Sequence, residues 1–129
     1  MQGKGWTVLR PGEIEEKAPS WRPDDTRRIV EVPLYADLKS SRCHVWRYPP
    51  GMQGRLHMHK EQEEVFVCLE GTFTLLLGDE GERVELPPQS VCVLLPLTPI
   101  RILNETDADA VFFIYGAPPV QADGVILAD

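Results

Sequence analysis

The chain has 129 residues, of which 43% are hydrophobic and 26% charged, the size and balance of one globular domain rather than of a disordered or fibrous chain. Its 13 Lys and Arg against 20 Asp and Glu give a formal net charge of −7. This charge excludes nucleic acid and anionic membranes as main partners, because both need a concentrated basic surface. No apolar run approaches the roughly 20 residues that span a bilayer, and residues 1–10 lack the apolar core of a signal peptide.

Three cysteines, Cys43, Cys68 and Cys92, are an odd number without C-x-x-C spacing. Cys68 and Cys92 lie inside apolar runs, where a thiol packs as a small hydrophobic side chain. We therefore expect cysteines that pack in the core rather than ligands or nucleophiles, and a reduced, cytoplasmic protein.

The predicted elements begin with an N-terminal arm over residues 1–28. The segment from Arg10 to Arg28 is charged, carries three prolines and includes Trp21, so we expect it to lie over the body of the domain. Residues 29–116 then hold short β-branched and aromatic runs between Gly and Pro turns, the pattern of an all-β domain. The predicted strands are Ile29–Pro33, Arg42–Tyr48, Arg55–His59, Glu64–Leu69, Thr72–Leu77, Arg83–Leu86, Val91–Leu95, Ile100–Leu103 and Ala110–Tyr115. Residues 117–129 are a tail whose Val125–Leu127 could dock onto the domain.

Strands spaced this closely, without crossover helices, pair antiparallel, and an antiparallel sheet hides its edges most economically as a sandwich or barrel. Three runs are apolar at consecutive positions, so that both strand faces require burial: Val65–Leu69, Val91–Leu95 and Val111–Tyr115. A small barrel buries only its inner faces. The outer face of at least one sheet therefore needs a cover, either the arm or a second chain, and we expect a homodimer.

Two of the three histidines, His57 and His59, lie two residues apart on a predicted strand. This spacing places both imidazoles on one face with their α-carbons about 6.6 Å apart, and they can converge on one ion at metal–nitrogen distances of about 2.1 Å. A carboxylate on the next strand would supply a third ligand. Glu64 is the preferred residue because it shares its parity with Phe66, although the pattern alone also allows Glu63.

Simple alternation along the same strand gives the opposite orientation. Leu56 and Met58 share one face and the two histidines share the other, so burial of the apolar pair would leave the imidazoles in solvent. Both orientations stay open on the pattern of this strand alone.

The stretch resembles the first motif of the cupin family, G-x5-H-x-H-x4-E-x6-G, at all five fixed positions: Gly51, His57, His59, Glu64 and Gly71. The resemblance implies a cupin double-stranded β-helix, or jelly-roll barrel, with an N-terminal arm. It also implies that the two histidines and the glutamate point into the barrel and bind a divalent metal ion, Fe, Mn, Ni, Zn or Cu. The apolar residues beside the histidines would then face outward.

The second cupin motif, G-x5-P-x-G-x2-H-x3-N, is degraded. Anchored on Asn104, only that asparagine is kept, and Ile100 stands where the family has its fourth metal ligand, a histidine. A second alignment, starting at Gly81, would place Cys92 there, but it leaves no room for the hairpin predicted just before it. Two histidines and one carboxylate are still a ligand set of non-haem iron sites and of some zinc sites.

The resemblance, which covers Arg42 to Gly116, implies a small-molecule metalloenzyme of oxygenase or isomerase type. The alternative is a non-catalytic binding or sensing module that takes an apolar or carboxylate ligand without metal. Arg55 shares the parity of the histidines and could hold a substrate carboxylate. The further candidates near the site are Tyr48, Phe66, Ile100 and, as a third imidazole, His44.

Overall fold

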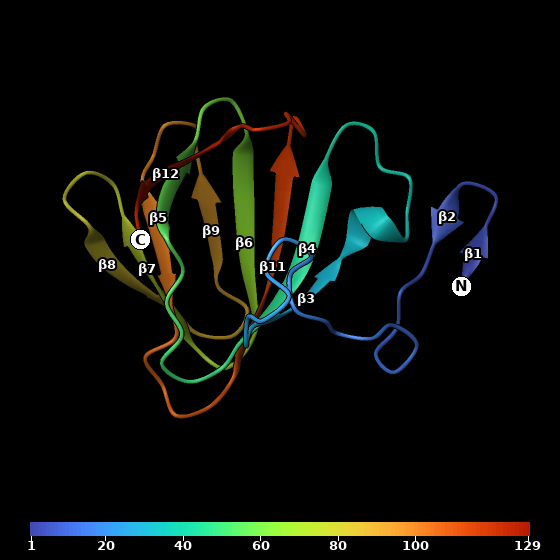
Figure 1. Cartoon of the computed structure of the whole chain (residues 1–129), viewed down its shortest axis with the longest axis horizontal. Helices are drawn as coiled ribbons and strands as arrows, with labels where there is room; N and C mark the ends of the chain where they lie inside the picture. Colours follow the sequence, from blue (N-terminus) through green and yellow to red (C-terminus); the bar gives the residue numbers. More distant parts are fainter.

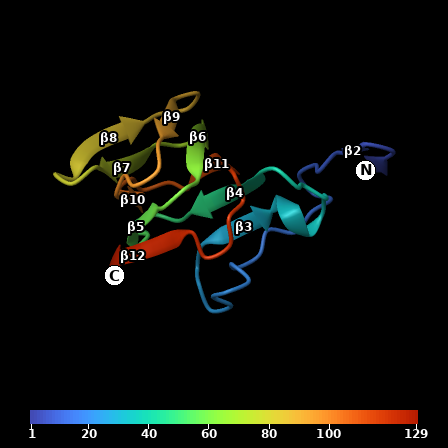
Figure 2. The same ribbon diagram turned by 90° about the horizontal axis from the view of Figure 1, so that it is seen from above.

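The computed structural model describes all 129 residues, and its regular secondary structure is almost entirely antiparallel β-strand. The strands are β1 (Gln2–Gly3), β2 (Trp6–Thr7), β3 (Arg28–Glu31), β4 (Arg42–Tyr48), β5 (Leu56–His59), β6 (Glu63–Glu70), β7 (Phe73–Leu77), β8 (Glu82–Leu86), β9 (Val91–Leu94), β10 (Ile100–Leu103), β11 (Ala110–Ala117) and β12 (Gly124–Ala128). Two five-stranded sheets face each other, with the orders β3-β4-β11-β6-β9 and β12-β5-β10-β7-β8 (Figure 1, Figure 2). The all-β fold expected from the sequence is confirmed.

All nine predicted strands form, with ends that differ by at most two residues. The first ends at Glu31 rather than at Pro33, because a proline has no N–H to give to the ladder, and Val32–Leu34 instead form a short 3-10 helix, η1. The predicted tail contributes β12, which pairs with β5 and lengthens the second sheet. The sequence pattern did not predict the two-residue strands β1 and β2.

The two glycines that bracket the first motif both lie at turns. Gly71, between β6 and β7, has φ +68°, and a Cβ at this position would collide with the carbonyl oxygen of Asp109. Gly51, before β5, has φ +79°. Only glycine adopts such angles without strain, so these residues define where the segment that carries the motif begins and ends.

The hydrophobic core lies between the two sheets and is centred on Phe73 and Phe112, whose rings stack with centroids 4.4 Å apart. Phe66, Leu75 and Ile100 are also fully buried there. These side chains fill the sandwich beside β7, and an open cleft is left between β4 and β5.

The N-terminal arm has two parts. The β1–β2 hairpin stands away from the sandwich (Figure 1), whereas Lys17 bridges to Ile29 and the ring of Trp21 lies 6.1 Å from that of Trp46, edge to face. Only the second part of the arm therefore lies over the domain. The structure has no helix with the length and hydropathy of a membrane span.

Candidate metal centre

Strand β5 turns His57 and His59 toward the cleft between the two sheets, and both line it. The strand lies between β12 and β10 in its sheet. All four of its residues are partly buried, so neither of its faces is a solvated surface. The histidines therefore lie inside the sandwich rather than in solvent.

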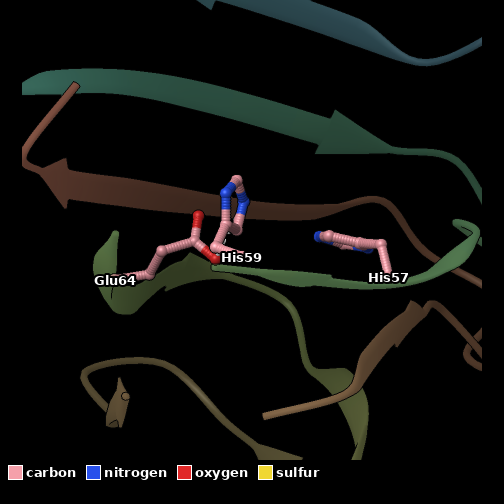
Figure 3. A group of neighbouring side chains, drawn as sticks. All are labelled: His57, His59 and Glu64. Atoms are coloured by element: carbon pink, nitrogen blue, oxygen red, sulfur yellow. Dashed lines mark ion pairs between the residues drawn. The ribbon is translucent and has the colours of Figure 1, made fainter. Parts of the chain in front are cut away.

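Glu64 reaches the same space from β6, where it is 7% exposed, whereas Glu63 is exposed. The ligand atoms of His57, His59 and Glu64 all lie within 4.8 Å of one another, and the ring of His59 stands between the other two side chains (Figure 3). Ligands on opposite sides of an ion with bonds of about 2.1 Å are roughly 4 Å apart. The cluster thus has the size of a site for one ion.

A hydrogen bond fixes which ring nitrogen of His57 carries the proton. Nδ1 of His57 lies 2.9 Å from the carbonyl oxygen of Arg55, which can only accept, so Nδ1 donates and Nε2 keeps its lone pair. Nδ1 of His59 lies 3.4 Å from Oδ2 of Asp123, and its Nε2 lies 3.6 Å from Oε1 of Glu64. The ring of His57 therefore presents a free Nε2, and Nε2 of His59 faces Glu64; imidazole nitrogens of this kind are common metal ligands.

Asp123 is a residue of the site that the sequence patterns missed. Its buried carboxylate accepts hydrogen bonds from the backbone N–H groups of Glu61, at 3.0 Å, and Gln62, at 2.9 Å. Burial acts to raise its pKa, but these donors and the nearby His59 hold the pKa below its ordinary value. A carboxylate behind a histidine ligand orients the ring. The only local signal was its place before Gly124, which is typical of a turn.

Burial dominates the electrostatics of the triad. It raises the pKa of Glu64 to about 7, although a hydrogen bond from Gln62 and the charge of Arg42 act to lower this pKa. The negative charge of Asp123 acts in the same direction as burial. Burial, followed by the charges of His57 and Arg42, lowers the pKa of His59. Oε1 of Glu64 is buried without a hydrogen-bond partner. A buried, unpartnered carboxylate oxygen that faces imidazole lone pairs fits a cation, so the residues present suit a divalent metal.

The cleft has a volume of about 1120 Å³ and is open at one side. Tyr48 and Arg55 line it; Arg55 lies at the rim, with its side chain 44% exposed and its Nε 3.5 Å from Oδ1 of Asp129. Phe66 and Ile100 are placed differently, because both pack in the core and neither lines the cleft. The structure thus brings two of the four candidate substrate contacts to the cleft.

His44 also lines the cleft, from β4, but it stands outside the triad. Burial and the positive charge of Arg42 lower the pKa of His44 to about 4. Its Nδ1 is buried and has no hydrogen-bond partner. This imidazole is therefore neutral near pH 7 and is not one of the three clustered ligands.

The arm contributes a cation that the sequence patterns also missed. Arg27 forms an ion pair of 2.7 Å with Asp25 and donates a hydrogen bond of 3.1 Å to the hydroxyl of Tyr48. Its guanidinium lies over the ring of Trp46, 4.9 Å from the centroid. These contacts close one side of the cleft and hold the arm in place.

The degraded second motif now has a structural account. Ile100 lies directly opposite His57 in the β5–β10 ladder, where an apolar side chain gives no fourth ligand. Asn104 is buried, and its amide donates to the carbonyl oxygens of Tyr48, at 2.9 Å, and Ala108, at 2.8 Å. The asparagine that the sequence keeps therefore holds the turn between β10 and β11 and does not contact the triad.

Comparison with known proteins places these features in a family. The family model of the cupin domain matches residues 44–115. No curated protein sequence matches the chain at a significant level.

Similar folds occur among solved structures. A sugar phosphate isomerase from Silicibacter pomeroyi superposes with a TM-score of 0.72 at 24% identity, over 87% of this chain and 76% of that one. KdgF from Halomonas sp. superposes with a TM-score of 0.74 at 16% identity, over 90% of this chain and 96% of that one. The polyketide cyclase RemF from Streptomyces resistomycificus superposes with a TM-score of 0.74 at 16% identity, over 95% of this chain and 85% of that one. At these identities the likeness establishes the fold alone.

Proposed function

This chain belongs to the cupin family, and on that premise we propose that it is a small-molecule metalloenzyme whose divalent ion is held by His57, His59 and Glu64. One observation carries the proposal: a ring nitrogen of each of two imidazoles and a carboxylate oxygen of the buried Glu64 lie within 4.8 Å of one another, and Oε1 of Glu64 has no hydrogen-bond partner. The backbone carbonyl of Arg55 orients the ring of His57, and the carboxylate of Asp123 lies beside the ring of His59.

Fe, Mn, Ni, Zn and Cu all accept this donor set. Such an ion would supply Lewis-acid or redox chemistry to a substrate in the cleft, and we propose a reaction of isomerase or oxygenase type. The similarity to a sugar phosphate isomerase supports the isomerase type. The chain's own part is to bind the substrate against the wall formed by Trp46 and Tyr48 and to shield it from water.

A second function is a binding or sensing module that takes its ligand without metal. Ile100 favours it, because this apolar side chain lies opposite His57 where a further ligand would strengthen metal binding. Binding of a small molecule in the cleft is common to both functions.

Metal analysis of protein purified without a metal-affinity tag tests the first function. We expect about one divalent ion per chain, lost from the double variant His57→Ala/His59→Ala and kept by the matched control His44→Ala, which removes an imidazole from the same cleft. Equilibrium dialysis against each candidate ion identifies the preferred one. A low metal content that the double variant leaves unchanged would exclude the metalloenzyme and favour the binding module.

We also propose a homodimer formed through the outer face of the β3-β4-β11-β6-β9 sheet. Ladder pairing aligns apolar side chains across this face, with Val91 and Val93 61% and 64% exposed. The aligned rows are Val91, Val67, Phe113 and Val45, and Val93, Val65 and Tyr115. Sedimentation at micromolar concentration should give a dimer that Val91→Lys/Val93→Lys dissociates and that Glu85→Lys, on the other sheet, leaves intact. A monomeric unmodified chain contradicts the proposal.

We further assign the protein to the cytoplasm, and its three unpaired thiols support this assignment. Burial raises the pKa of Cys43, Cys68 and Cys92, which keeps all three as unreactive thiols at neutral pH. Recovery of the native protein from an oxidising compartment in cell fractionation would contradict the assignment.

A further inference from the structure

Arg42 begins β4 on the face that lines the cleft. The ladder places it opposite Gly116 of β11, and Gly116 in turn lies opposite Glu64 of β6. Arg42 and Glu64 thus lie in one row across three strands, with α-carbons about 10 Å apart. The residue between them, Gly116, has no side chain of its own, which leaves a space between the guanidinium and the triad.

Gln62 fills this space and holds the guanidinium through its Nε. The side chain of Gln62 is 3% exposed, and its Oε1 accepts a hydrogen bond of 2.7 Å from Nε of Arg42. It runs through the space that Gly116 leaves free, where a Cβ would collide with the amide. A glycine inside a strand weakens the strand and marks a close approach of other groups, which here is the passage of Gln62.

The far end of Arg42 is unpaired. Its terminal nitrogens, Nη1 and Nη2, have no hydrogen-bond or ion-pair partner, whereas two other arginines of the cleft, Arg27 and Arg55, lie 2.7 and 3.5 Å from carboxylates. Arg42 is therefore a fixed cation beside the triad without a carboxylate of its own.

From this geometry we propose that Arg42 binds a carboxylate group of the substrate through Nη1 and Nη2, which makes small organic acids the substrate class. With Nε engaged by Gln62, the guanidinium offers two parallel N–H donors, the arrangement that matches both oxygens of one carboxylate. One uncompensated positive charge suits a monoanion better than a phosphate dianion. The proposal rests on the proposed function, because it requires a small molecule in the cleft beside the triad.

The test compares probes that differ only in their charged group. Benzoate, its neutral analogue benzamide, and phenyl phosphate are titrated into the full-length protein as purified, with the fluorescence of Trp46 and Trp21 in the cleft as the readout. Each titration is repeated after the metal is removed with a chelator. The variants are Arg42→Gln, Arg42→Lys and the matched control Arg55→Gln, each checked for its fold by circular dichroism and for its metal content.

We expect benzoate to bind at least about tenfold more tightly than benzamide, as a charge-assisted pair requires. This preference should survive removal of the metal and the Arg55→Gln change. It should fall several-fold in Arg42→Lys, which keeps the positive charge but lacks the two parallel N–H donors. It should vanish in Arg42→Gln. Arg42→Gln should keep the metal content of the unmodified protein, which separates this test from that of the metal site. The proposal is overturned if benzoate does not bind saturably, if phenyl phosphate binds more tightly, or if the preference survives in Arg42→Gln, depends on Arg55 or disappears with the metal.

Discussion

Replacement of Glu64 by glutamine should stabilise the metal-free protein at neutral pH while it abolishes metal binding. Burial raises the pKa of Glu64 from 4.5 to about 7. Between these values the folded state holds a proton that the unfolded state releases, so stability falls as pH rises through this range. At 1.36 kcal/mol per pKa unit, this difference in pKa corresponds to about 3 kcal/mol of the free energy of unfolding. The metal-free protein has lost this stability completely above pH 7. Glutamine removes the ionisation and keeps the shape.

His44 and His59 act in the opposite direction, because burial lowers the pKa of both imidazoles. The quantity to measure is therefore the difference in stability between the Glu64→Gln variant and the unmodified protein. His44 has a folded pKa of about 4 against an ordinary 6.5, so it binds a proton more readily when unfolded. Its contribution to stability is complete above pH 6.5 and lost as pH falls toward 4. Both proteins share this contribution, and it cancels in their difference.

Urea unfolding of chelator-treated protein at pH 4.5, 6 and 8 measures this difference. We expect Glu64→Gln to match the unmodified protein at pH 4.5 and to exceed it by up to about 3 kcal/mol at pH 8. Glu63→Gln, at the exposed neighbouring position, should show no such gain. Addition of the preferred metal should stabilise the unmodified protein alone. A Glu64→Gln variant that is less stable at pH 8, or whose pH profile parallels the unmodified one, would refute a buried, high-pKa carboxyl at this position.

Other substitutions test the surroundings of the site. Asp123→Asn removes the charge behind His59 and should weaken metal binding by about 10- to 100-fold with the fold intact, measured by competition with a chromophoric chelator; unchanged affinity would deny Asp123 its orienting role. Gly116→Ala should displace the side chain of Gln62 and destabilise the protein by about 1–3 kcal/mol in urea unfolding, and a neutral effect would show that the strand has spare room. Phe112→Ala should destabilise by about 3–5 kcal/mol, because its ring is fully buried; a loss below 1 kcal/mol would place the core elsewhere.

Local patterns were sufficient for the strands and for the preference for Glu64. Strand length, turn residues and parity depend on neighbours in sequence, and they predicted nine strands and favoured Glu64 over Glu63 as the inward residue. The orientation of His57 and His59 was different, because both faces of β5 are partly buried and alternation carries no information on such a strand. Only the resemblance of the whole motif, from Gly51 to Gly71, to the first cupin motif implied the inward orientation.

The residues that sequence patterns missed depend on contacts between distant segments. Asp123 meets the backbone of Gln62 across 61 residues, and Arg42 meets the side chain of Gln62 across 20. Parity favoured Arg55 as the residue that binds a substrate carboxylate, but parity does not show whether the guanidinium already forms an ion pair within the protein. Asp129, at the far end of the chain, pairs with Arg55, and no local pattern predicts that contact.

These distant contacts meet in one short loop, residues 60–62 between β5 and β6. Asp123 fixes its backbone through two N–H groups and touches His59 at its start, while the Gln62 side chain at its end holds Arg42. Strand β12, which lies in the predicted C-terminal tail, extends directly from Asp123 and pairs with β5. The C-terminal strand therefore supports the candidate metal ligands and the arginine proposed to bind an anion through the same loop, so that a shift of this strand would disturb both together.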